Sequence, residues 1–223
     1  MTDHQDQPSQ QPDRFPETLA EKLAVLADLG IRGRDGGPLD DLRKRLVDEQ
    51  RARLGYEPSD IRFEELFAVL TWEERSPDVM MFDFECIDDP KAYSGILYRL
   101  NDLFRGSLGL TNVDSFVDRD AQTAWASCNA GGKAYRVDLR WKEDWADSKI
   151  IDFVANIAKE RGIKRRLAYL DCGGQNIALF ALTETELSEL RRRTGLDVNW
   201  IWEIPAHLKA ILRSLETERG TER

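Results

Sequence analysis

Residues 123–141, TAWASCNAGGKAYRVDLRW, decide the fold class of this chain. Two runs in which apolar and polar residues alternate flank the stretch 129–132, which contains two consecutive glycines. Side chains alternate between the two faces of a strand, and glycine adopts the backbone angles of tight turns, so the pattern predicts a β-hairpin. A hairpin requires antiparallel pairing, which excludes a doubly wound, all-parallel sheet.

A second hairpin is predicted in residues 169–182, YLDCGGQNIALFAL. Two apolar runs suited to strands enclose Gly173 and Gly174, which supply the positive φ angles of a turn. The polar residues of the turn also suggest an active site. We leave open whether Asp171 and Gln175 form hydrogen bonds across the turn or face a partner.

Cys172 is the sharpest candidate for catalysis in this turn. A catalytic thiol needs a base or a cation beside it, and the base is usually a histidine. The chain contains only two histidines, His4 and His207. A Cys172–His207 pair has no local support, so we interpret Cys172 as a small buried residue at the end of a strand.

Working outward from the hairpins, helical and strand patterns follow one another from residue 79 onward. The expected elements outside the hairpins are strands at 79–87, 113–120 and 197–204 and helices at 88–106, 146–163 and 183–196. The last helix begins with a capping-box pattern, Thr183 with Glu186 three residues later. The order is therefore β-α-β-β-β-α-β-β-α-β, and the expected fold class is α+β, a mostly antiparallel sheet with packed helices.

A helical segment precedes this domain. Leucines recur at helical spacing in residues 16–29, Asp40 or Asp41 begins a charged helix, and residues 63–72 form a third, short helix. The expected organisation is a disordered tail (1–14), a helical N-terminal segment (15–75), an α+β domain (79–204) and a C-terminal helix with a frayed tail (205–223).

The charge of the chain limits the kinds of partner that we expect it to bind. The net charge is −9, with 17 acids and 10 bases in residues 1–74, 13 and 10 in residues 75–150, and 11 and 12 in residues 151–223. This balance disfavours a polyanionic partner, because long-range repulsion acts before contact. A basic partner would be attracted to the first two thirds of the chain.

Cysteine use and hydropathy indicate a cytoplasmic protein. The three cysteines are dispersed and form no CxxC pair, which suits buried thiols in a reducing compartment. No apolar run reaches the length of a membrane span, and the N-terminus lacks the pattern of a signal peptide. We therefore expect a cytoplasmic location.

Carboxylates gather around two stretches of the α+β domain. Asp83 and Glu85 lie two positions apart and share a strand face, so they can hold a hard cation or divide acid and base roles. Helix capping and a solvated surface are the competing explanations, since Asp89 and Asp147 stand where helices begin. The candidate partner-binding residues are Asp83, Glu85, Asp88, Asp89, Asp144, Trp145 and Asp147. We assign no catalytic residue, metal ligand or cofactor.

Two runs of basic residues suggest a different function, the binding of a nucleic acid. Residues 164–166 (KRR) and 191–193 (RRR) would contact phosphates if the fold brought them together. Each run also lies at the end of a predicted helix, where cations are favoured by the helix dipole. We favour the second explanation, because the chain is acidic and no aromatic residues are interleaved with the cations.

Three stretches carry a resemblance to known proteins: FDFECIDD (82–89), KEDWADSKI (142–150) and YLDCGGQNIALFALT (169–183). In this order they resemble a group of bacterial cytoplasmic α+β proteins that includes presumed immunity proteins of polymorphic toxin systems. The resemblance spans roughly residues 79–202. It implies an acidic, non-catalytic module that binds and blocks a toxin domain, and it assigns no functional residue.

The expected function is therefore a non-catalytic cytoplasmic binding protein of immunity or inhibitor type, which engages a basic protein partner through acidic and aromatic residues. Two alternatives remain open. One is a metal-dependent enzyme that uses the clustered carboxylates. The other is a nucleic-acid-binding regulator that uses Arg165, Arg166 and the run 191–193.

Overall fold

The computed structural model of the chain describes residues 15–33, 36–39, 42, 61–72 and 76–201. Its helices are α1 (Leu19–Asp28), α3 (Phe63–Trp72), α4 (Ala92–Leu103), α5 (Lys149–Glu160) and α6 (Glu184–Thr194). Its strands are β1 (Met80–Asp83), β2 (Thr111–Asp118), β3 (Thr123–Ala130), β4 (Lys133–Arg140), β5 (Arg166–Asp171), β6 (Asn176–Leu182) and β7 (Asn199–Trp200). The α+β class is confirmed, and so is the predicted order of elements from β1 to β7.

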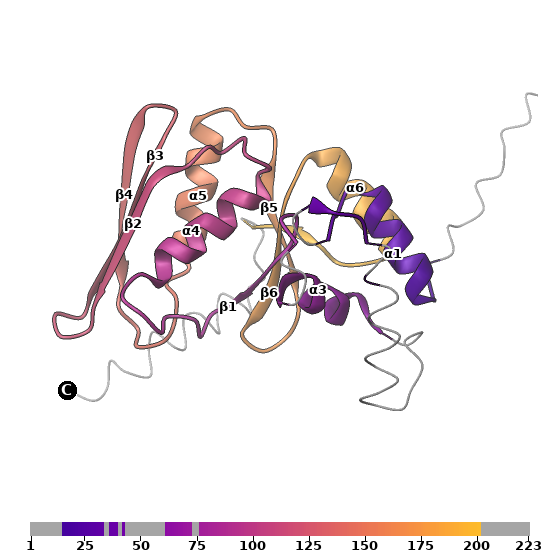
Figure 1. Cartoon of the computed structure of the whole chain (residues 1–223), viewed down its shortest axis with the longest axis horizontal. Helices are drawn as coiled ribbons and strands as arrows, with labels where there is room; N and C mark the ends of the chain where they lie inside the picture. Colours follow the sequence, from indigo (N-terminus) through magenta and orange to yellow (C-terminus); the bar gives the residue numbers. More distant parts are fainter. Residues whose placement is uncertain (1–14, 34–35, 40–41, 43–60, 73–75, 202–223) are drawn as a thin grey trace, which may run out of the picture.

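These elements form four layers (Figure 1). An antiparallel sheet of order β2-β3-β4 is followed by α4 and α5, then by a second antiparallel sheet of order β1-β6-β5-β7, and finally by α1, α3 and α6. The sequence predicted a single sheet. The division into two sheets is a tertiary feature: α4 and α5 lie between them, and β1 pairs with β6, far from it in the chain.

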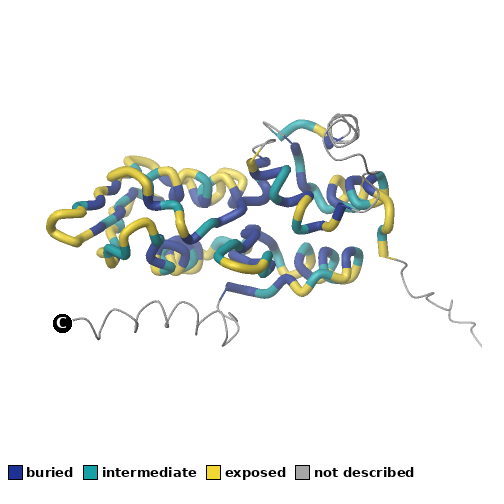
Figure 2. The backbone as a smooth tube through the Cα atoms, turned by 90° about the horizontal axis from the view of Figure 1, so that it is seen from below, coloured by how far each residue is buried: buried dark blue, intermediate teal, exposed yellow. Residues whose placement is uncertain are grey.

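The burial of each strand depends on whether helices cover one face of its sheet or both. The strands β5 and β6 are buried at nearly every position, because helices cover both faces of their sheet. The strand β3 alternates between buried and less buried residues, because only one face of its sheet packs against helices. Figure 2 shows buried positions concentrated in the middle of the molecule and exposed ones at the hairpin ends of the outer sheet.

Two hydrophobic cores lie on the two sides of the four-stranded sheet. One fills the space between the sheets and contains Tyr93 and Leu97 of α4 and Ile150 and Val154 of α5. The other joins this sheet to α1, α3 and α6 and contains Phe67, which meets Phe180 of β6 edge to face at 5.2 Å. The N-terminal helices therefore share a core with the strands of the α+β domain.

Local signals placed the β3–β4 turn and the α6 cap correctly, whereas the N-caps of α4 and α5 are Lys91 and Ser148 and not the expected Asp89 and Asp147. Gly131 and Gly132 make the β3–β4 turn with φ angles of 56° and 79°, as a two-residue hairpin turn requires. The capping box predicted for α6 is present, since Thr183 and Glu186 each accept a hydrogen bond from the other's backbone N–H. Within the described residues, no helix is long and apolar enough to cross a membrane.

Some predictions differ from the structure or lie outside it. The strand β7 spans Asn199–Trp200, whereas the strand was predicted over 197–204, of which 202–204 lie outside the described residues. The tail 1–14, most of the charged helix expected after Asp40 or Asp41, and the helix expected in 205–223 lie outside the described residues.

Candidate functional site

Main-chain hydrogen bonds join three distant segments at one end of the molecule. The backbone N–H of Phe84 donates to Gln175 O (3.1 Å), that of Ala146 donates to Phe84 O (2.7 Å), and that of Ile87 donates to Asp144 O (2.8 Å). The segment after β1, the loop before α5 and the β5–β6 turn therefore form one continuous surface. It lies along the lower edge of Figure 1, and we call it the acidic end.

Five of the seven candidate residues contribute carboxylates to the acidic end: Asp83, Glu85, Asp88, Asp89 and Asp144. All except the half-buried Asp83 are exposed. Asp83 accepts a hydrogen bond from Glu85 N (2.9 Å) and Asp89 one from Lys91 N (2.6 Å), so both order the local backbone. None of the five forms an ion pair with a described lysine or arginine; the contact of Arg119 here is to the main-chain oxygen of Asp88.

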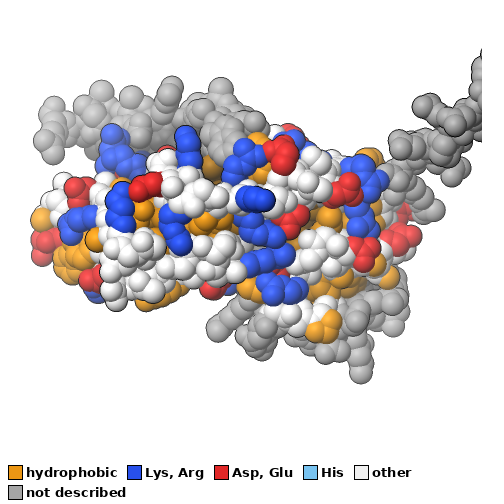
Figure 3. Space-filling model, turned by 90° about the horizontal axis from the view of Figure 1, so that it is seen from above, with side chains coloured by type: hydrophobic (Ala, Val, Ile, Leu, Met, Phe, Trp, Pro, Cys, Tyr) orange, Lys and Arg blue, Asp and Glu red, His pale blue; other side chains and the backbone are white. Residues whose placement is uncertain are grey.

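Carboxylates elsewhere in the described chain are commonly paired. The pairs are Asp78 with Arg32 and Arg105, Asp28 with Arg193, Glu65 with Arg62, Glu184 with Arg166, Glu186 with Arg165, Glu189 with Arg192, Asp114 with Lys91, Glu160 with Lys133 and Asp138 with Arg136. The acidic end thus gathers five carboxylates that form no ion pair within the described part of the chain, whereas most other carboxylates of that part are paired or stand apart from one another. The opposite face, seen from above in Figure 3, carries a band of Lys and Arg side chains.

Asp147 lies elsewhere. It is 4% exposed, and its carboxylate accepts hydrogen bonds from the backbone N–H groups of Arg140 (2.8 Å) and Lys149 (3.0 Å). Its own N–H donates to the hydroxyl of Tyr93 (2.8 Å). This network connects β4, α4 and the start of α5, so the Asp147 side chain stabilises the fold and does not belong to the acidic end.

Trp145 holds the acidic end against the core. Its backbone pairs with Glu85 in an isolated antiparallel bridge, and its half-buried ring packs against the core between the two sheets. The ring is therefore partly accessible to a partner and partly a structural anchor for the loop that carries Asp144.

The two polar residues of the β5–β6 turn, Asp171 and Gln175, have different roles. Asp171 accepts a hydrogen bond from Gly173 N (2.9 Å), within the turn. Gln175 donates from its side-chain amide to the carboxylate of Glu85 (2.8 Å), outside the turn. Thus Asp171 shapes the hairpin, and Gln175 connects the hairpin to the acidic end.

The cysteines near this surface are poor nucleophiles. Burial, aided by Glu64 and Asp171, raises the pKa of Cys172 to about 11. Burial, aided by Asp83 and Asp88, raises the pKa of Cys86 to about 12. Both thiols are protonated at neutral pH, which favours a structural role.

The structure also shows acids that the sequence reasoning missed. The backbone N–H of Val117, at the end of β2, donates to Pro90 O (2.9 Å), which brings the β2–β3 turn beside the acidic end. The carboxylate of Asp118 accepts from two backbone N–H groups of that turn, and Asp120 is exposed. No local sequence signal indicates this proximity, because it depends on how β2 packs beside the start of α4.

The basic runs are engaged in contacts within the chain. Arg165 pairs with Glu186 (2.5 Å), and Arg166 pairs with Glu184. In the second run, Arg191 donates to Val198 O (2.6 Å), while Arg192 and Arg193 form ion pairs with Glu189 and Asp28. These contacts attach α6 to its neighbours and leave the arginines poorly placed for phosphates.

Across the described part of the chain, no group of three or more His, Cys, Asp or Glu residues is arranged to hold a metal ion. No protein-family model, curated protein or solved structure matches the chain.

Proposed function

We propose that the protein is a non-catalytic binding protein whose acidic end engages a basic protein partner. The observation that carries the proposal is the gathering of mostly exposed carboxylates without ion-pair partners among the described residues. They come from residues 83–89 and from Asp144, 61 positions after Asp83, and main-chain hydrogen bonds join the two segments. Such a surface attracts a cationic partner over a distance and holds its charges in a fixed arrangement. An inhibitor or immunity role in the cytoplasm is the specific form of this function that we favour.

The two alternatives have less support from the geometry. The carboxylates of Asp83 and Asp89 accept hydrogen bonds from backbone N–H groups, and no described group of side chains converges as metal ligands do. A nucleic-acid regulator would need free cations in the basic runs, whereas the arginines of those runs hold carboxylates and carbonyls of the chain itself.

The test compares two charge-matched double variants. Asp88→Asn with Asp144→Asn removes two carboxylates of the acidic end, and Asp102→Asn with Asp197→Asn removes two exposed carboxylates elsewhere. Partners are captured from an extract of the native host with the wild-type chain, purified, and tested by stopped-flow association at low and high salt. We expect the captured protein to be basic and its association rate to fall several-fold in the first variant and at high salt.

The control variant should associate at a rate close to that of the wild type. A partner that binds both variants equally fast would show that the acidic end is not the binding surface. An association rate that does not depend on the salt concentration would show the same.

A further inference from the structure

The strand β4 forms an open edge of the three-stranded sheet. The backbone N–H of Arg140 points away from β3 and donates to the Asp147 carboxylate (2.8 Å). Since backbone groups alternate between the two sides of a strand, the N–H groups of Ala134, Arg136 and Asp138 point to the same side. None of these three N–H groups has a hydrogen-bond partner among the described residues, and all three residues are exposed. They are therefore available to another strand.

The two edges of this sheet differ. At the β2 edge, the N–H of Val117 donates to Pro90 O (2.9 Å), so the start of α4 closes that edge. Natural edge strands are commonly blunted by a bulge or a proline, which prevents pairing with another chain. The register of β4 with β3 has no shift from Lys133 to Arg140, and β4 contains no proline. The backbone of β4 therefore has the regular shape that strand pairing requires.

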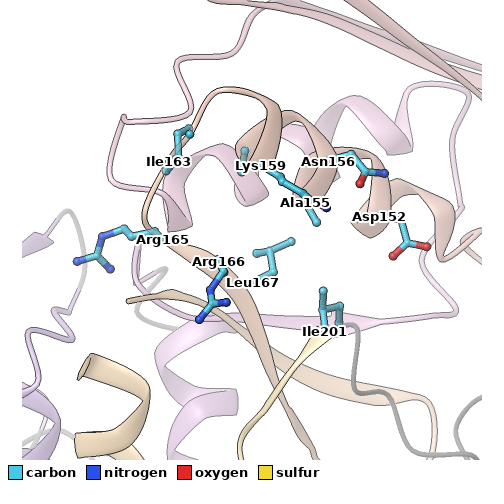
Figure 4. Close-up of a pocket in the computed structure, with 11 residues that line it drawn as sticks. Asp152, Ala155, Asn156, Lys159, Ile163, Arg165, Arg166, Leu167 and Ile201 are labelled. Carbon is cyan, nitrogen blue, oxygen red and sulfur yellow. The ribbon is translucent and has the colours of Figure 1, made fainter. Parts of the chain in front are cut away.

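The strand β4 is held in place at both ends. Lys133 pairs with Glu160 at the end of α5 (2.6 Å), and the N–H of Arg140 is bound to Asp147 in the loop before α5. The neighbouring Lys159 instead lines a hollow of about 730 Å³ beside β5 (Figure 4). Because β4 is already fixed in its extended shape, pairing with a second strand has a smaller ordering cost.

The inner face of β4 leaves apolar surface for a neighbouring strand to cover. Tyr135 and Val137 are half-buried, whereas the residues opposite them on β3, Cys128 and Ala126, are buried. The helices that pack on this sheet thus cover β3 more completely than β4. A strand paired with the free edge would bury more of Tyr135 and Val137, and the burial of apolar surface is the main favourable contribution to association.

The outer face of β4 carries opposite charges two positions apart. The Arg136 guanidinium lies 4.3 Å from the centre of the Trp125 ring and 3.4 Å from the Asp138 carboxylate, and both charged side chains are more than half exposed. In an antiparallel pair of β4 strands centred on Val137, Arg136 of each copy lies opposite Asp138 of the other. Registers centred on Arg136 or Asp138 instead place that residue opposite its own copy, where like charges repel. The charges therefore favour one register.

We propose that β4 pairs edge to edge with β4 of a second copy of this chain, in the antiparallel register centred on Val137. The two three-stranded sheets then form one continuous sheet with a two-fold axis between the two Val137 residues. The Val137 side chains meet in a non-hydrogen-bonded pair, where side chains approach most closely. Arg136 and Asp138 exchange backbone hydrogen bonds with the other copy. This contact uses no carboxylate of the acidic end.

The test measures the self-association of the full chain by sedimentation velocity. A contact of two strands is smaller than a standard interface of roughly 1,200–2,000 Å², so the dimer should be weak and should form between about 10 µM and about 1 mM. Arg136→Asp places like charges opposite each other twice and should weaken the dimer at least about tenfold. Adding Asp138→Arg to this variant exchanges the two charges and should restore most of the affinity.

A control variant and hydrogen exchange identify the surface. Arg62→Asp makes the same change of charge at an exposed residue before α3, on the far side of the molecule, and should not affect association. Exchange of the Arg136 and Asp138 amides, followed by NMR, should slow several-fold at the highest concentration, while that of Arg140, already bound to Asp147, should not. Circular dichroism verifies the fold of each variant.

Three results would overturn the proposal. The first is a chain that stays monomeric at the highest concentration. The second is equal association of Arg136→Asp and Arg62→Asp. The third is a dimer that forms without slower exchange of the Arg136 and Asp138 amides, since that dimer would use another surface.

Discussion

The side-chain amide of Gln175 donates a hydrogen bond of 2.8 Å to the carboxylate of Glu85, a residue 90 positions earlier in the chain. The main chains of the two segments are also joined, since Phe84 N donates to Gln175 O. The β5–β6 turn therefore positions a carboxylate of the acidic end as well as reversing the chain. A surface of fixed charges recognises a partner more selectively than one of freely moving side chains.

Gln175→Glu should destabilise the fold at neutral pH. The substitution replaces a donor with a second carboxylate beside Glu85, so an exposed hydrogen bond is lost and a repulsion is gained, roughly 1 kcal/mol in total. Urea unfolding at pH 7 measures this change. Added salt should shrink the repulsive part of the penalty. Gln175→Ala loses only the hydrogen bond, so a penalty that is equal in the two variants and independent of salt would contradict the contact.

One glycine of the β5–β6 turn and one glycine inside a helix give a matched pair of predictions. Gly173 has a φ of +83°, and a methyl group added there meets nothing within 4 Å. Gly173→Ala should therefore cost roughly 1 kcal/mol through backbone strain alone. Gly95 lies inside α4 with equally open space around it. Gly95→Ala should stabilise the chain by roughly 0.5–1 kcal/mol, because alanine is the better helix former.

Thermal or urea unfolding of the two variants compares these opposite effects directly. If Gly173→Ala were neutral, the turn would not require a positive φ at that position, and the hairpin geometry of residues 171–176 would be wrong.

The order of the elements could be predicted because its signals are local. The turn glycines 131 and 132 and the pair Thr183–Glu186 act within a few residues of themselves, and the structure has the hairpin and the capping box where the sequence predicted them. The assembly of these elements into two sheets has no such signal. An alternating strand specifies which residues share a face, but not which strand lies beside it, so the pairing of β1 with β6 was not predictable.

The exposure of single candidate residues also depends on tertiary packing that the sequence does not reveal. Asp144 and Asp147 stand three positions apart in one acidic stretch and look alike in sequence. The structure exposes Asp144 and buries Asp147 under the hydroxyl of Tyr93. The partner of Arg193 could not be predicted either, because Asp28 and Arg193 are 165 positions apart in the chain. Whether a charge is free or paired is a property of tertiary packing.

The cysteines should react slowly in the folded chain. Burial raises the pKa of Cys128 and of Cys172 to about 11 from an ordinary value of 9.0, and that of Cys86 to about 12. Because only the thiolate is nucleophilic, iodoacetamide at pH 7.5 should alkylate the folded protein at least about tenfold more slowly than the urea-unfolded protein. Mass spectrometry of the modified peptides assigns each rate. Rapid alkylation of Cys172 in the folded chain would restore it as a candidate nucleophile.

Asp78 connects the N-terminal helices to the rest of the fold. Its side chain is 2% exposed and accepts hydrogen bonds from Arg32, which follows α1, and from Arg105, which follows α4. Burial opposes its ionisation, but the hydrogen bonds and charge of the two guanidinium groups outweigh burial and lower the pKa of Asp78. Asp78→Asn should cost about 3 kcal/mol, the low end for a broken buried pair, because both arginines are partly exposed.

The pH dependence of this loss of stability follows from the direction in which the pKa of Asp78 is shifted. A carboxylate whose pKa is lower in the folded than in the unfolded state stabilises the fold above its unfolded pKa, and this stabilisation is lost as the pH falls through the folded value. The difference in unfolding free energy between the wild type and Asp78→Asn should therefore be constant from pH 7 to about pH 5 and shrink below about pH 4. Urea unfolding across this range measures it, with Asp102→Asn, an exposed acid on α4, as the control. A difference that stayed constant down to pH 3 would mean that the ionised form of Asp78 contributes nothing, and that the network around Asp78 acts only through its shape.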